Sequence, residues 1–103
     1  MSDDSTQYSV VIHDAAAQML YSHVRFLSNV SVSAARKLRS ALFDAFTSLE
    51  KMPQRCPLFS TRRALGTYHR MIVGRYQVVF SINEKSNTVN IYYILDSRQD
   101  NDI

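Results

Sequence analysis

The chain has 103 residues, of which 46% are hydrophobic and 11% aromatic, so it is expected to fold as one ordered globular domain and not to be disordered. No apolar run approaches the about 20 residues needed to span a bilayer, so no membrane-spanning helix is expected. The formal net charge of +3 understates an uneven distribution of charge along the chain, and charge alone does not choose among nucleic acid, ribosome and acidic protein as a partner.

The first expected elements are a short strand followed at once by a helix. The strand "YSVVI", Tyr8 to Ile12, alternates β-branched and aromatic residues. Asp14 is an expected N-cap for the helix "AAAQMLYSHVRFLSN", in which apolar residues recur at helical spacing. His23 lies in this helix with no metal-binding partner at a useful spacing, so packing or solvation is the favoured reading of this side chain.

A second helix follows the break "NVSVS", and either Ser31 or Ser33 is expected to cap it. The pattern predicts that this helix ends near Met52, because Pro53 disfavours helical backbone at the residue before it. One continuous apolar stripe predicts a helical hairpin packed on a sheet; it comprises Ala35, Leu38, Leu42, Ala45, Leu49 and Met52.

The segment "PQRCPLFSTRRALG" is expected to be an irregular link, since it contains both prolines of the chain and ends in Gly66. Leu58, Phe59 and Leu65 indicate that the link packs at least partly against the sheet. Cys56 in this link is the only cysteine, so it forms no internal disulfide and reads as a spectator thiol.

The last third of the chain has the period of strands. A two-residue connection at Gly74 and Arg75 predicts a hairpin with a type II′ turn. One face of the following strand is expected to carry Tyr76, Val78, Phe80 and Ile82. After the turn "NEKSN", the last strand is expected to turn its apolar side to the core, with Val89, Ile91, Tyr93 and Leu95.

These elements predict an α+β single domain over residues 1–103 in the order β-α-α-β-β-β, with a two-helix hairpin on a mainly antiparallel twisted sheet. Residues 1–6 and 101–103 are expected to be flexible tails. The N-terminal sequence shows no signal-peptide pattern, and with the lone cysteine this favours a cytoplasmic location. The partner of the first strand stays open.

Positive charge is concentrated in the second half of the chain. Between Lys51 and Asn83 there are basic residues and no acidic ones: Lys51, Arg55, Arg62, Arg63, Arg70 and Arg75. Two readings stay open, a surface for an anionic partner and a set of cations that only solubilise a loop and a sheet edge.

Four features together resemble the RelE/ParE superfamily of bacterial type II toxins. They are the opening strand and helix, the close of the second helix in "LEKMP", the hairpin "YHRMIVGRYQVVFSI" and the end "VNIYYILDSRQD". The resemblance covers Tyr8 to about Asp100. It implies a small cytoplasmic toxin that arrests growth, needs no cofactor or metal, does not act on membranes, and is neutralised by a cognate antitoxin that also determines its oligomeric state.

The family has two branches, and the resemblance leaves both open. RelE-like members are metal-independent endoribonucleases that cut messenger RNA in the ribosome, with cations stabilising the charge that develops on the phosphate. ParE-like members inhibit DNA gyrase and are not nucleases. Whether this chain is an enzyme, and whether its target is the ribosome with its mRNA or gyrase, is therefore undecided.

The resemblance implies a partial nuclease site. Arg70 matches one strand cation of the RelE nucleases and Arg98 matches the arginine after the last strand, so these two are the candidate catalytic residues. The arginine that nucleases place after the strand tyrosine falls on Gln77. Arg62, Arg63, Arg75 and Gln77 are candidate RNA- or target-binding residues.

Simpler explanations of the same residues also stay open. Arg98 has acidic neighbours at Asp96 and Asp100, with which it can form an exposed ion pair. A non-toxic RNA- or protein-binding α+β module is one alternative function, with bases stacking on sheet tyrosines. A degenerate, inactive toxin is another.

Overall fold

The computed structural model describes residues 6–59 and 67–98, so Arg62, Arg63, Leu65 and most of the expected tails lie outside the described residues. The elements in chain order are β1 (Ser9–Ile12), α1 (Asp14–Ser28), α2 (Val32–Ser48), the 3-10 turn η1 (Pro53–Arg55), β2 (Leu58–Phe59), β3 (Tyr68–Val73), β4 (Tyr76–Asn83) and β5 (Thr88–Asp96). None of the helices in these two ranges is long and apolar enough to cross a membrane.

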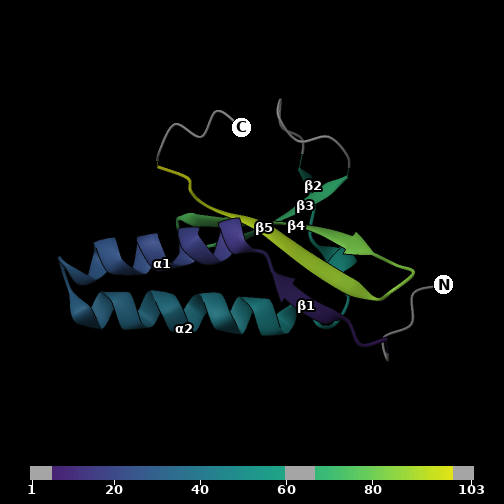
Figure 1. Ribbon diagram of the computed structural model, residues 1–103, viewed down its shortest axis with the longest axis horizontal. Coiled ribbons are helices and arrows are strands. Elements are labelled where there is room, and N and C mark those ends of the chain that lie inside the picture. The colour runs from purple at the N-terminus through teal and green to yellow at the C-terminus, as the bar shows by residue number, and fades with distance from the viewer. Residues whose placement is uncertain (1–5, 60–66, 99–103) are drawn as a thin grey trace.

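The five strands form one sheet in the order β1-β5-β4-β3-β2 (Figure 1). The three contacts β2–β3, β3–β4 and β4–β5 are antiparallel. β1 pairs parallel with β5, Ser9 opposite Thr88 and Ile12 opposite Ile91, which supplies the partner that the sequence left open. The α+β class and the helical hairpin are confirmed, and the two-residue β2 is an addition within the segment expected to be irregular.

The two helices begin and end slightly differently from the prediction. Asp14 is the first residue of α1 and not its cap, because the N-cap position falls on His13, which makes no side-chain capping bond. Ser31 caps α2 by accepting a hydrogen bond from the backbone N–H of Ala34 at 3.1 Å. α2 ends at Ser48, before the expected Met52, and the chain then turns so that Glu50 accepts a backbone hydrogen bond from Tyr8 at 2.8 Å.

The core lies between the helical hairpin and one face of the sheet, which we call the helix-covered face. Leu42, Phe46 and Leu49 pack there against strand residues, so most of the predicted α2 stripe is buried. The predicted inward residues of β4 are confirmed, since Val78 and Phe80 are fully buried. The strand side of this face carries Met71, Val73, Tyr76, Val78, Phe80, Ile82, Val89, Ile91 and Ile94.

A β-bulge in β5 changes which residues reach the core. Val79 pairs with Tyr93 and the next residue, Phe80, pairs with Ile91, so Tyr92 is the extra residue. A bulge residue interrupts the alternation of a strand. Beyond it Ile94 faces the helix-covered core, and Tyr93 and Leu95 do not share its face as expected; Leu95 is buried all the same, and Tyr93 is half-buried. Both share the opposite face of the sheet with their partners Val79 and Gln77.

The β3–β4 turn fits the predicted type. Gly74 has φ of +60° while Arg75 keeps a negative φ, which is the sign pattern of a type II′ turn. An L-residue is strained at the Gly74 position even though a Cβ there would meet no atom within 4 Å.

Candidate functional site

Arg70 lies on the sheet face directed away from the helices, which we call the far face. This face carries Tyr68, Arg70, Ile72, Gln77, Val79, Tyr93 and Leu95. The alternation of β3 puts Arg70 there, because its neighbours His69 and Met71 are opposite the core residues Phe80 and Val78.

The Arg70 side chain is held by two neighbours on the far face. Its Nη1 donates a hydrogen bond to Oε1 of Gln77 at 3.3 Å, and its guanidinium carbon lies 5.2 Å from the ring centroid of Phe59. Its Nε is buried and has no hydrogen-bond partner among the described residues. The predicted pair of Arg70 and Gln77 is thus brought together, and Phe59 of β2 is a contact that the alternation pattern did not indicate.

Aromatic rings extend this surface toward β1. Tyr92 packs edge-on against Tyr68, with centroids 5.8 Å apart, and stacks on His13 at 4.6 Å. The Nε2 of His13 is 2.9 Å from Oδ1 of Asn90, which fixes the ring. Tyr92, which makes this contact, is the bulge residue of β5, and no sequence motif indicated His13 as part of it.

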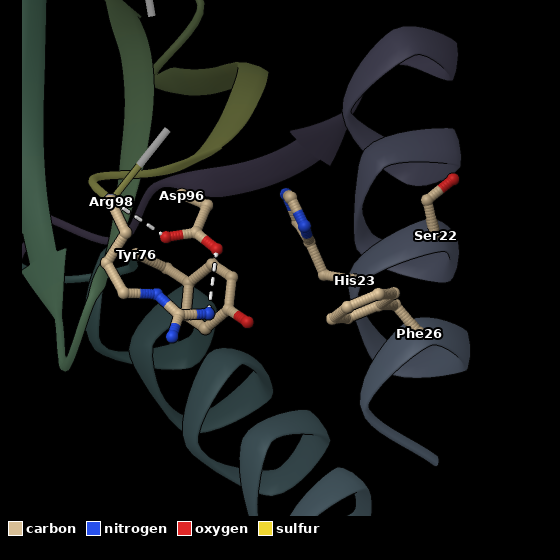
Figure 2. A pocket seen from close by; sticks show the side chains of 6 residues that line it. All are labelled: Ser22, His23, Phe26, Tyr76, Asp96 and Arg98. Carbon is tan, nitrogen blue, oxygen red and sulfur yellow. Dashed lines mark hydrogen bonds and ion pairs between the residues drawn. The ribbon is translucent and has the colours of Figure 1, made fainter. Parts of the chain in front are cut away.

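Arg98 belongs to a different part of the molecule. It follows the end of β5 and lines a pocket of about 640 Å³ between α1 and the ends of β4 and β5 (Figure 2). We call this the Arg98 pocket; it is lined by Ser22, His23, Phe26, Tyr76, Asp96 and Arg98. The two candidate catalytic arginines therefore lie in separate surroundings, Arg70 on the far face and Arg98 beside α1.

An ion pair lines the strand side of the Arg98 pocket, across from α1. Oδ1 of Asp96 accepts the backbone N–H of Arg98 at 2.9 Å, and Oδ2 lies 3.4 Å from a guanidinium nitrogen of the same residue. Burial acts to raise the pKa of the Asp96 carboxyl. The hydrogen bonds and charge of Arg98, with the nearby His23, outweigh burial and leave this pKa below its ordinary value. Of the two acidic neighbours named as possible partners, Asp96 forms the ion pair, with a buried carboxylate where an exposed pair was expected, and Asp100 lies outside the described residues.

His23 forms the helix side of the same pocket. Its Nε2 lies 2.6 Å from the carbonyl oxygen of Ile94, so this nitrogen carries the proton and donates. The imidazole also packs against Tyr76, with centroids 4.9 Å apart. The sequence signal for this role is the helical spacing from Leu20, which directs His23 toward the sheet. The reading of His23 as a packed residue agrees with these contacts.

The remaining candidates are less informative. Arg75 is exposed in the β3–β4 turn, where its carbonyl oxygen accepts the backbone N–H of Ser97 at 2.8 Å. Arg62 and Arg63 lie outside the described residues. Burial raises the pKa of the Cys56 thiol more than Arg55 lowers it, so Cys56 is not an activated nucleophile. In residues 6–59 and 67–98, no group of three or more His, Cys, Asp or Glu side chains is placed to hold a metal ion.

Solved structures first define the class of fold. The chain is similar to the toxin–antitoxin complex RelBE2 from Mycobacterium tuberculosis, at 23% identity and a TM-score of 0.64, covering 91% of this chain and 97% of that chain. It is also similar to the archaeal RelE–RelB complex from Pyrococcus horikoshii OT3, at 20% identity and a TM-score of 0.58, covering 88% and 96%. These likenesses identify a RelE-like fold. A search of curated proteins gave no match.

The family follows from the sequence profile. Residues 10–101 match the family described as ParE toxin of type II toxin–antitoxin system, parDE. The chain belongs to this family and is the toxin component of a type II toxin–antitoxin system. The resemblance to the RelE/ParE superfamily is thereby confirmed.

Proposed function

We propose that this toxin acts in the cytoplasm as a ParE-like inhibitor that binds DNA gyrase, and that a cognate antitoxin neutralises it. The observation that carries the proposal is the separation of Arg70 from Arg98. The family match supports the gyrase branch, because the profile that fits residues 10–101 is that of ParE toxins.

RNA cleavage of the RelE type needs several cations around one phosphate. A donor aimed at developing charge is worth about a hundredfold or more in rate. Here Arg70 contacts the neutral amide of Gln77, where RelE nucleases carry an arginine. Arg98 pairs with Asp96 in the pocket beside α1 and is not part of the far face. The far face thus has one of the cations that such chemistry uses, and the charge of the other is directed elsewhere.

One feature favours ribosome-dependent RNA cleavage as a second candidate. Arg70 lies among aromatic rings on the far face, and its buried Nε has a donor with no partner in the described part of the chain. Arginine and aromatic side chains together are suited to stacking on unpaired bases. A nuclease acting through Arg70 alone would be slow, and this ranks the candidate second.

The experiment that separates the two activities is induced expression followed by two readouts in the arrested cells. We expect the DNA to show lost supercoiling and the message ends to stay intact. Purified toxin should block supercoiling by purified gyrase in proportion to the amount of toxin added. New message ends at ribosome-occupied codons, with normal gyrase activity, would refute the proposal. Growth equal to that of the empty vector would favour a degenerate toxin or a non-toxic module.

An arginine-to-alanine pair sharpens this test. If the toxin inhibits gyrase, Arg70→Ala should weaken that inhibition no more than the loss of any other single positive charge does. If the toxin cleaves RNA, the same substitution should lower the rate of cleavage about a hundredfold. Arg36→Ala, at an exposed position on α2, is the control for the loss of one positive charge.

A further inference from the structure

We propose that the Arg98 pocket is an anchoring site for the antitoxin, and that it takes an apolar side chain next to a carboxylate. This rests on the proposed function only in that an antitoxin binds the toxin. It adds the surface, the residues and the chemistry of the segment recognised. The pocket is defined by contacts between α1 and the end of the sheet, and it contains neither Arg70 nor Gln77.

The apolar part of the site is the space between Phe26 and Tyr76. Figure 2 shows the Phe26 ring on α1 directed into the pocket, across from Tyr76 and Arg98. Phe26 is 68% exposed, although a large apolar side chain on the wall of a pocket gains most when it is covered. Tyr76 is already buried, so a partner side chain seated there would mainly cover the Phe26 ring, and aromatic residues covered in this way act as anchors in interfaces.

The polar part of the site selects a negative charge. The Asp96 carboxylate is 8% exposed and engaged by the backbone and guanidinium of Arg98. The Arg98 side chain is 59% exposed and uses one nitrogen for Asp96, so its remaining N–H groups are available to a ligand. A carboxylate can accept two parallel hydrogen bonds from such a guanidinium.

The charges around the pocket agree with this choice. The titratable groups that line the pocket are His23, Tyr76, Asp96 and Arg98. Arg25 lies outside the lining and is hydrogen-bonded to Tyr21 on α1, and Arg75 is in the β3–β4 turn, where its carbonyl oxygen accepts the N–H of Ser97. Among the described residues, the lining holds one acidic residue, Asp96, which already has partners, and one arginine, Arg98. Because the guanidinium of Arg98 is exposed and the carboxylate of Asp96 is buried, electrostatic complementarity favours an acidic segment over a basic one.

The antitoxin is the partner to which this chemistry commits. A protein that must keep a toxin inactive needs slow dissociation, and desolvated aromatic anchors next to a fixed ion pair act mainly on dissociation. The expected segment is an amphipathic helix or strand that places a Leu, Phe or similar side chain on Phe26 and Tyr76, with an Asp or Glu reaching Arg98.

The test measures binding of purified toxin to the protein encoded by the adjacent reading frame, using surface-immobilised toxin. Phe26→Ala and Arg98→Glu should each weaken binding about tenfold to a hundredfold, mostly through faster dissociation. Tyr21→Ala is the matched aromatic control, since Tyr21 is 63% exposed on α1 but does not line the pocket. Arg36→Glu makes the same change of charge on α2. Both controls should stay within about twofold of the unchanged toxin.

A second measurement does not depend on variants. In the unchanged toxin, the imidazole NMR signals of His23 should shift when the antitoxin is added, because the ring lines the pocket and is held by the Ile94 carbonyl. Tight binding with unmoved His23 signals, or with pocket variants equal to their controls, would overturn this inference and leave the proposed neutralisation intact. If the unchanged toxin binds no antitoxin, the proposal that a cognate antitoxin neutralises it is itself wrong.

Discussion

Replacing Gln77 with arginine restores the residue that nucleases of the superfamily carry, and it should destabilise this fold. Gln77 accepts a hydrogen bond from Arg70 at 3.3 Å, and both side chains are half-buried on the far face. Gln77→Arg removes the acceptor and puts a second guanidinium in its place. The result should be a lower free energy of unfolding and no gain of RNA cleavage.

The size of the effect follows from the distance. Two like charges about 4 Å apart repel by about 4 kcal/mol at an effective dielectric constant of about 20. Because the longer arginine can swing toward solvent, much of this is relieved, and the lost hydrogen bond adds about 0.5–1.5 kcal/mol. We expect a net loss of about 1–2 kcal/mol.

Urea unfolding followed by circular dichroism measures this loss. It should shrink in about 1 M salt, where the Debye length falls to about 3 Å. Gln18→Arg is the matched control, because Gln18 is exposed on α1 and the substitution adds the same charge. The assigned contact between Arg70 and Gln77 would be refuted if the Gln77→Arg protein had the same free energy of unfolding as the control. It would also be refuted if the loss of that free energy did not change with salt concentration.

Three further predictions concern the elements that position the two sites. Ser31→Ala should lower the free energy of unfolding by about 1 kcal/mol, because it removes the cap of α2, while the exposed Ser33→Ala should change the urea midpoint little. The lowered pKa of Asp96 makes the charged form favourable in the folded state. Its contribution should be present above the ordinary aspartate pKa of about 3.9 and lost as the pH falls through the lower folded value; Asp96→Asn should flatten urea midpoints measured across that window. Ile94→Ala should cost about 2–5 kcal/mol in urea unfolding and Tyr93→Ala clearly less, since only Ile94 faces the core; equal costs would contradict the bulge at Tyr92.

Much of the fold was predictable because long elements have clear periods. The α2 stripe and the alternation of β4 both identified buried residues, among them Leu42 and Phe80. The β5 assignment was right only up to the bulge, because an inserted residue carries no composition signal and shifts every later side chain to the other face. β2 is two residues long, too short for any period to appear.

The pairing of β1 was not predictable from local pattern. Four alternating residues suit either edge of a sheet and either direction, so the choice of β5 depends on how the helical hairpin returns the chain.

The sequence predicted which residues form the candidate sites, but not where these residues lie relative to one another. Resemblance selected Arg70, Gln77 and Arg98 together, but the direction of Arg98 is decided by its bonds to Asp96, two residues before it. His23 lines the Arg98 pocket because the helical spacing of α1 directs it toward the sheet, and a pattern of metal-binding residues would not have indicated this role.

The parallel pairing of β1 with β5 has a consequence for the time at which the toxin first exists. Of the described strands, β1 is synthesised first and its pairing partner β5 is synthesised last, so Ser9 can pair only after Thr88 has been made. At about 5–20 residues per second, the ribosome needs roughly 4–16 s to synthesise the chain between them. Until then the apolar sides of β1 and the helices lack β5, which lies between β1 and β4 in the sheet. A translation product interrupted before β5 therefore lacks Tyr93 and Leu95 of the far face and both Asp96 and Arg98 of the Arg98 pocket, so neither surface is complete until β5 is in place.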